Sequence, residues 1–168
     1  MPDDASVVLS DVLRSDLRIA QQNEITEHHI YLRLADRQKD PQNAEILRHI
    51  AQDERRHHDF FREYTGEDAT PNQLRVRWYT LLAAALGLTF SIKLMERGEE
   101  RAQVSYDRIA ESIPEARHVA DDEERHEAEL IGMIDEERLR YVGSVVLGLN
   151  DALVELTGAL AGLTLALA

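Results

Sequence analysis

The stretches "AQDERRHH" (residues 51–58) and "ADDEERHE" (residues 120–127) decide how this sequence folds. Both follow the pattern Ala-x-Asp-Glu-x-Arg-His, so each places a glutamate three residues before a histidine. In an α-helix such residues lie on one face, about 60° apart and about 4.5 Å along the axis. Glu54 and His57 can therefore converge on one bound ion, and so can Glu123 and His126.

The composition predicts an all-α protein. Only 4 prolines and 8 glycines occur among 168 residues, and the long runs between them are rich in strong helix formers such as Ala, Leu, Arg, Glu and Gln. With no cysteine in the sequence, carboxylates and imidazoles must hold any metal. The net charge of −13 argues against nucleic acid as a partner and is compatible with attracting cations, although an acidic surface also serves solubility.

Four amphipathic helices follow from the apolar pattern. We expect them over residues 6–38 and 41–64, in the second half of a long segment after Pro71, and from Pro114 onward. Each apolar stripe is interrupted near its middle by polar residues, which are Glu24 and Glu27, Glu54 and His57, Glu99, and Glu123 and His126. Burying several ionised carboxylates unpaired would cost several kcal/mol each, and a pair of bound cations removes that objection.

A third Glu-x-x-His pair, Glu115 and His118, provides an internal control. It lies one position before the stripe, roughly 100° round the helix from the core, and we interpret it as surface. Other polar residues receive ordinary interpretations. We expect histidines off the stripes (His28, His29, His49 and His58) to face solvent, Tyr31 and Tyr106 to pack in the core, Asp53 and Asp122 to lie beside the ligands or on the helix surface, and Arg56 and Arg125 to pair with carboxylates.

The sequence also repeats as pairs of helices. Glu24-x6-Tyr31-x3-Ala35 recurs as Glu99-x6-Tyr106-x3-Ala110, so each half contributes one glutamate from its first helix and Glu-x-x-His from its second. Two halves give four carboxylates and two imidazoles, the ligand set of ferritin-like di-iron bundles. The sequence resembles the rubrerythrin branch of these proteins over about Leu9 to Glu137.

The resemblance implies a ferritin-like four-helix bundle that binds two iron ions through Glu24, Glu54, His57, Glu99, Glu123 and His126. Rubrerythrins often use an extra glutamate, and Glu27 or Glu96 could supply it. Manganese or zinc stays open, because carboxylate–imidazole sites accept several divalent ions. The sequence departs from full rubrerythrins in one respect. It contains no Cys-rich rubredoxin segment, which serves those proteins as an electron relay, so peroxide reduction by that route is in doubt.

The C-terminal segment is apolar and resembles a second family. Residues 148–154, "GLNDALV", match the first membrane helix of the vacuolar-iron-transporter family, and fusions of the two kinds of domain are known as membrane-bound ferritins. We expect a di-iron domain over residues 1–138 and a truncated transporter domain over residues 139–168. Arg138 and Arg140 would keep the preceding domain in the cytoplasm. The alternative is a terminal helix buried in a soluble core or an oligomer interface.

The expected function is to bind and oxidise Fe(II) with dioxygen or peroxide, a ferroxidase-type activity, in partnership with an attached iron transporter. The resemblance implies a role in iron export, storage and detoxification. We also expect a homodimer, because the apolar Trp78–Leu94 segment needs covering. The alternatives are a non-catalytic iron sensor or delivery module, and a helical oligomerisation domain without metal.

Overall fold

The protein is all-α, as predicted. The computed structural model describes the backbone of residues 11–167 and their side chains except at 96–105, 107, 135–140, 161–162 and 164–167. Its helices are α1 (Asp11–Ala35), α2 (Pro41–Thr65), α3 (Gln73–Leu86), α4 (Leu88–Ser112) and α5 (Arg117–Leu167), with a 3-10 turn at Pro114–Ala116. No strand occurs within residues 11–167. The chain divides into two compact units, Met1–Leu130 and Ile131–Ala168.

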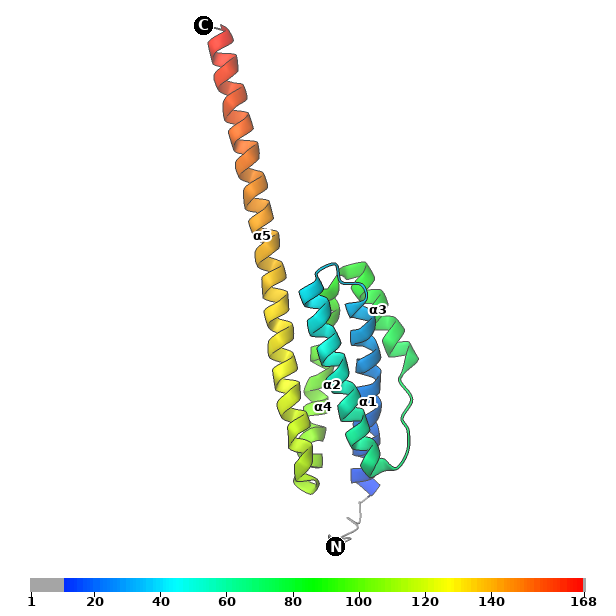
Figure 1. Cartoon of the computed structure of the whole chain (residues 1–168). Coiled ribbons are helices and arrows are strands. Elements are labelled where there is room, and N and C mark those ends of the chain that lie inside the picture. Colours follow the sequence, from blue (N-terminus) through cyan, green and yellow to red (C-terminus); the bar gives the residue numbers. More distant parts are fainter. Residues whose placement is uncertain (1–10, 168) are drawn as a thin grey trace. The chain divides into compact units, whose positions relative to one another are not determined.

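The first unit is a ferritin-like helical bundle. Helices α1 and α2 run antiparallel beside α4 and the Arg117–Leu130 segment of α5, while α3 lies outside, against α1 and α4 (Figure 1). The predicted stripes form its core. One cluster of buried residues draws on all four bundle helices and comprises Leu13, Leu17, Ala20, Phe61, Tyr106, Ile109, Ile113, Ala116 and Val119.

Helix boundaries mostly follow the local sequence. Asp40 caps α2 by accepting hydrogen bonds from the backbone N–H groups of Gln42 and Asn43, and Pro41 occupies the first turn. Gly66 ends α2 in the left-handed conformation at φ 69°. The first helix ends at Ala35 rather than at the predicted Gln38, and its predicted start at residues 6–10 lies outside the described residues.

The segment from Gln73 to Ser112 forms two helices, a break that we did not predict. Gly87 separates α3 from α4 with φ 93° and ψ 160°, a conformation that favours glycine. After Ile113 the chain forms one 3-10 turn at Pro114, so the last helix begins at Arg117. These short-range features redirect the chain without changing which stripe faces the core.

Polar contacts fix the start of α3 on α1. Thr26 accepts a hydrogen bond from the backbone N–H of Asn72, whose side chain caps the first turn of α3. Arg75 then reaches back, donating to Oδ1 of Asn23 at 2.8 Å and lying 3.5 Å from Oε1 of Glu27. The first turn of α3 is therefore anchored to the middle of α1.

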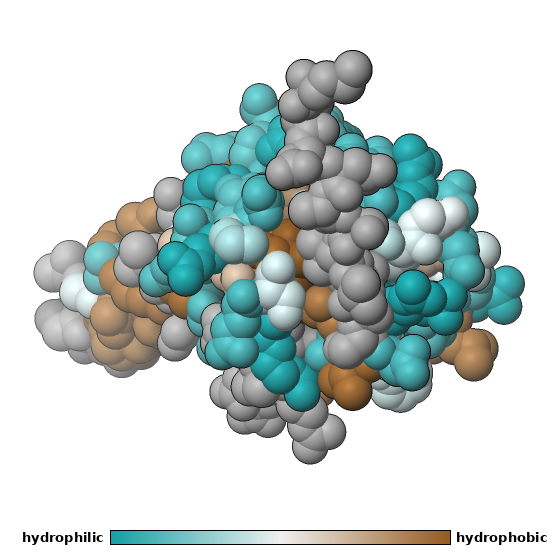
Figure 2. Space-filling model, turned by 90° about the horizontal axis from the view of Figure 1, so that it is seen from below, coloured by the Kyte–Doolittle hydropathy of each residue, from teal (hydrophilic) through white to brown (hydrophobic). Residues whose placement is uncertain are grey.

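The second unit contains an apolar helical segment. Tyr141–Leu160, 20 residues with a mean hydropathy of 1.2, is long and apolar enough to cross a bilayer by length and composition. Its side chains are exposed. In Figure 2, hydrophobic side chains predominate on this segment, at the left, whereas hydrophilic side chains cover most of the bundle face. The expected domain boundary at residue 138 stays a prediction.

Candidate metal centre

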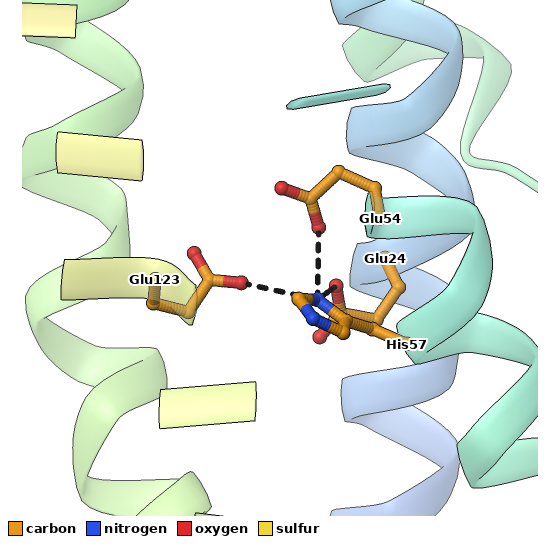
Figure 3. Close-up of side chains that lie close together, drawn as sticks. All are labelled: Glu24, Glu54, His57 and Glu123. Atoms are coloured by element: carbon orange, nitrogen blue, oxygen red, sulfur yellow. Dashed lines mark ion pairs between the residues drawn. The ribbon is translucent and has the colours of Figure 1, made fainter. Parts of the chain in front are cut away.

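Three helices bring four of the predicted ligands together inside the bundle. Glu24 comes from α1, Glu54 and His57 from α2, and Glu123 from α5, and one ligand atom from each lies within 4.8 Å of the others (Figure 3). The Nδ1 atom of His57 faces all three carboxylates, at 3.5 Å from Glu24, 3.8 Å from Glu54 and 3.6 Å from Glu123. A cation bound at about 2.0–2.2 Å from N and O ligands separates opposite ligand atoms by about 4 Å, so the cluster has the size for one ion.

His126 extends the cluster along the bundle. Its Nδ1 atom lies 3.3 Å from Oε1 of Glu54, and its ring centroid is 6.0 Å from that of His57. Glu54 thus lies between the two imidazoles, with one carboxylate oxygen toward each. A carboxylate placed in this way can bridge two ions, each with its own histidine.

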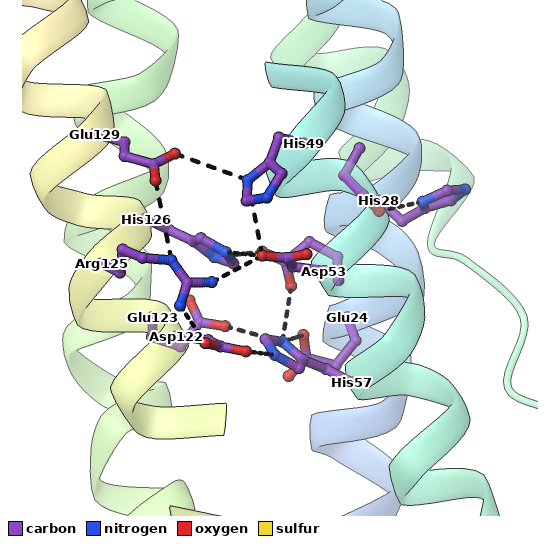
Figure 4. Close-up of polar contacts among 12 residues, drawn as sticks. Glu24, His28, His49, Asp53, His57, Asp122, Glu123, Arg125, His126 and Glu129 are labelled. Carbon is purple, nitrogen blue, oxygen red and sulfur yellow. Dashed lines mark hydrogen bonds and ion pairs between the residues drawn. The ribbon is translucent and has the colours of Figure 1, made fainter. Parts of the chain in front are cut away.

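The two repeated aspartates orient these histidines by crossing between helices. Nε2 of His57 on α2 hydrogen-bonds to Asp122 on α5 at 3.0 Å, and Nε2 of His126 on α5 hydrogen-bonds to Asp53 on α2 at 3.1 Å (Figure 4). A proton held on Nε2 by the aspartate leaves the Nδ1 lone pair directed toward the centre. This is how carboxylates prepare a histidine to bind a metal.

Together with arginines, the two aspartates form an outer layer of side chains around the cluster. Asp53 is fully buried, accepts a hydrogen bond from Arg125 at 2.9 Å and forms an ion pair with Arg56. Arg125 also donates a hydrogen bond of 2.6 Å to Asp122. The predicted pairing of Arg56 and Arg125 with carboxylates is confirmed. Among the described residues, no ion pair joins Glu24, Glu54 or Glu123 to an arginine, so the positive side chains serve the aspartates rather than the central glutamates.

The buried atoms without partners all face the centre. In the described part of the chain, the buried side-chain N and O atoms without a hydrogen-bond partner are Oε2 of Glu24, Oε2 of Glu54, Nδ1 of His57, Oε1 of Glu123 and Nδ1 of His126. Buried polar atoms are rarely left in this state, because losing water without gaining a partner costs roughly 1–3 kcal/mol each. A bound cation would satisfy these acceptors together, so the donor set fits a metal.

Tyr106 connects the core to the cluster. Its buried hydroxyl donates a 2.5 Å hydrogen bond to Oε1 of Glu24, and its ring stacks on Phe61 at 6.1 Å. Core packing was predicted for Tyr106 and Tyr31, and both are buried. The sequence did not reveal the bond to Glu24, which leaves the other oxygen of that carboxylate free to face His57.

Burial and crowding shift the pKa values at this site. Burial, and then the neighbouring Glu54, raise the pKa of Glu24 to about 8. Burial alone would lower the pKa of His126, but Glu54 together with Asp53 and Glu123 raises it to about 9. The pKa of His57 is likewise lowered by burial and raised far more by its three glutamate neighbours. Without metal, the cluster therefore holds protons at neutral pH.

Metal affinity should rise with pH between about 6 and 9, because a ligating Glu24 must be ionised and the imidazoles neutral. The stability of the metal-free protein should change in the opposite direction. Folding raises the pKa of Glu24 from 4.5 to about 8 and that of His126 from 6.5 to about 9. These shifts stabilise the folded state fully when the pH is below the pKa of the unfolded state. That stabilisation is lost as the pH rises through the pKa of the folded state.

Thermal unfolding with and without metal over this pH range checks both trends. The melting temperature of the metal-free protein should fall with pH, and the increment from added metal should grow. Calorimetric titration in buffers of different ionisation enthalpy should register proton release. An affinity independent of pH would contradict protonated ligands.

The remaining predicted site residues are not among the four described residues that form the cluster. Glu27 is buried, with its carboxylate beside Arg75. The side chains of Glu96 and Glu99 lie outside the described residues, although both positions fall within α4. Glu115 and His118 are exposed, as expected for the control pair.

The prediction that His58 faces solvent is wrong. Its side chain is buried, with Nε2 3.3 Å from Nε2 of Gln21 and Nδ1 3.1 Å from Oδ1 of Asp59. Gln21 also binds the backbone carbonyl of Glu67, so the chain following α2 and the face of α1 enclose this histidine. His49 is exposed as predicted, whereas His28 and His29 are half-buried.

A ferritin-like helical bundle with a buried carboxylate–imidazole cluster defines the class of this protein. The chain belongs to the rubrerythrin family, since the sequence model described as Rubrerythrin matches residues 15–134. No curated protein matches the chain, and no solved structure does either. Family membership and the cluster together support iron binding.

Proposed function

We propose that the bundle binds two iron ions and oxidises ferrous iron. The observation that carries this proposal is the set of five buried atoms that face one another without partners, three carboxylate oxygens and two imidazole nitrogens. Hard oxygen ligands suit iron in its oxidised form, and imidazole suits both oxidation states. In a metal-free oligomerisation domain, protons on Glu24 and on the imidazoles would have to balance these buried carboxylates instead.

The proposed ligands would serve two ions, and Glu54, with one oxygen toward each imidazole, could contribute to both. His57 would serve one ion and His126 the other, with Glu24 and Glu123 completing the ligands described around them. Glu99, the repeat counterpart of Glu24, is proposed as the sixth ligand. Glu27 or Glu96 is the proposed additional ligand, and Glu27 would have to share its carboxylate with Arg75.

When bound, two ferrous ions each supply one electron, so that the pair reduces dioxygen to peroxide, or peroxide to water, with protons taken from solution. The residues of the chain prepare this reaction. Asp122 and Asp53 hold the imidazole Nε2 protons, which keeps both Nδ1 atoms available. Tyr106 fixes the orientation of Glu24, and the apolar core around it limits access of water.

Oxygenation of the iron-loaded protein tests this function. The protein is loaded anaerobically with Fe(II) and then exposed to air, and a ferric absorbance band should appear in step with dioxygen consumption. Binding without that band would favour the alternative, an iron sensor or delivery module. Absence of tight binding would favour the oligomerisation domain.

We further propose that the apolar helix of the second unit is a membrane span attached to an iron-transporter domain. The support is the Tyr141–Leu160 segment and the likeness of residues 148–154 to the vacuolar-iron-transporter family. Oxidised or bound iron would then be passed to the transporter for export or storage. With Arg138 and Arg140 preceding the span, the bundle would lie in the cytoplasm. The expected homodimer stays a prediction.

A further inference from the structure

An apolar face on the outside of the bundle has no role in the proposed iron chemistry. It consists of Leu74, Trp78 and Leu81 on α3, together with Leu86 at the end of α3 and Phe90 at the start of α4, and we call it the α3 apolar face. All five side chains are exposed, Trp78 by 55%. Contiguous exposed apolar side chains mark interaction sites, whereas apolar residues exposed singly are ordinary.

The α3 apolar face lies mostly on a helix that is anchored to the bundle. Leu74, Trp78 and Leu81 are spaced i, i+4 and i+7, so they form one stripe along α3, while Val76 and Thr80 are buried. The cap at Asn72 and the contacts of Arg75 with α1 anchor the start of the helix. Arg37 of the segment after α1 donates to the carbonyl of Thr80 at 2.7 Å. The stripe is thus presented by an ordered helix.

Its charge differs from that of the rest of the chain. Residues 73–95 contain Arg75, Arg77 and Lys93 and no aspartate or glutamate, whereas the whole chain has a net charge of −13. A two-fold symmetric pairing of this face with a second copy would bring basic residues together without acidic partners from the segment. Tryptophan and basic side chains are favourable at the headgroup level of anionic membranes, where the indole ring lies at the interface and the positive charges attract lipid phosphates.

The proposed span would also hold the bundle close to a membrane. The bundle unit ends at Leu130 and the candidate span begins at Tyr141. The intervening stretch, residues 131–140, can extend no more than about 35 Å whatever its conformation. Residues 131–140 belong to helix α5, and a connection this short would keep the bundle at the lipid surface at a high effective concentration.

We infer that the α3 apolar face docks on the anionic lipid headgroups of the membrane that anchors the chain. The inference rests on the proposed membrane span. Trp78, Leu74 and Leu81 would enter the interface, and Arg77 and Lys93 would lie among the lipid phosphates. Trp78 is the only tryptophan of the chain, so its fluorescence reports on this face alone.

The test uses the full chain reconstituted into vesicles of phosphatidylcholine, with or without phosphatidylglycerol. Flotation of the vesicles measures insertion, and quenching of Trp78 by iodide or by lipids brominated near the headgroup measures docking. In the anionic vesicles, emission should shift to the blue, iodide quenching should fall several-fold, and the brominated lipids should quench. The double variant Arg77→Glu, Lys93→Glu should float equally well but regain iodide quenching.

Each other outcome overturns the inference in a distinguishable way. Flotation with an iodide-accessible Trp78 would refute docking and leave the span intact. Trp78 shielded from both iodide and brominated lipid would mean that a protein, such as a second copy, covers the face. Failure to float with either vesicle would refute the span and the docking together, while the iron titration of the bundle would be unaffected.

Discussion

Replacing Glu54 and His57 together by alanine is expected to abolish tight metal binding. Glu54 is the one carboxylate with an oxygen toward each imidazole, and His57 faces three carboxylates, so the double variant removes the shared bridge and the histidine of one ion. The affinity should fall by more than about a hundredfold, since loss of an outer-layer partner alone costs 10- to 100-fold. Competition with a metal-sensitive dye measures it.

The chain supplies its own matched control. Glu115→Ala with His118→Ala removes the same two residue types at the same spacing from exposed positions, where the His118 ring meets the edge of the His57 ring at 6.2 Å without facing its Nδ1 cluster partners. This variant should bind metal like the unaltered protein. If it lost binding, or if the Glu54–His57 variant retained it, the claim that stripe position selects the functional pairs would be wrong.

Asp53→Asn should weaken metal binding by about 10- to 100-fold although Asp53 is not a proposed ligand. The Asp53 carboxylate is buried, accepts from Nε2 of His126, and neutralises Arg125 and Arg56. An amide of the same shape loses that charge, so His126 is less well oriented and less basic. Asp122→Asn should have a smaller effect, because the side chain of Asp122 is 20% exposed and water can replace part of its contact with His57.

Asp121→Asn is the control for this pair, since Asp121 is the adjacent aspartate and is exposed. Metal affinity of the Asp121 variant should be unchanged. Circular dichroism should show that all three variants remain helical, which separates a loss of orientation from a loss of fold. An Asp53 variant with the affinity of the unaltered protein would show that the aspartates do not orient the histidines for metal binding.

Periodicity predicted the bundle because its four stripes are long and the core positions repeat every three or four residues. Leu17, Ile50, Ile92 and Val119, one from each stripe, are all fully buried. The break at Gly87 was missed, since a glycine within a helical pattern is usually tolerated and only the return of α4 along the bundle requires the turn. Nearby residues alone show that a segment is helical, whereas the residue at which the chain reverses direction depends on how the helices pack.

The site was predictable where it lies on the stripes and not where distant segments meet. Repetition of Asp and Arg in both motifs indicated an outer layer, but their crossing between α2 and α5 depends on how those helices face each other. For His58, position relative to the apolar stripe gave the wrong prediction. It lies off the core face of α2 and is buried only because Gln21 and the residues after α2 close over it.

The cluster around Glu54 is expected to hold metal. Anaerobic titration of the unaltered protein with Fe(II) tests it most directly, with free iron measured after each addition. About two tightly bound ions per chain are expected, one for each of the buried Glu-x-x-His motifs. A protein that binds no iron tightly under these conditions would contradict it.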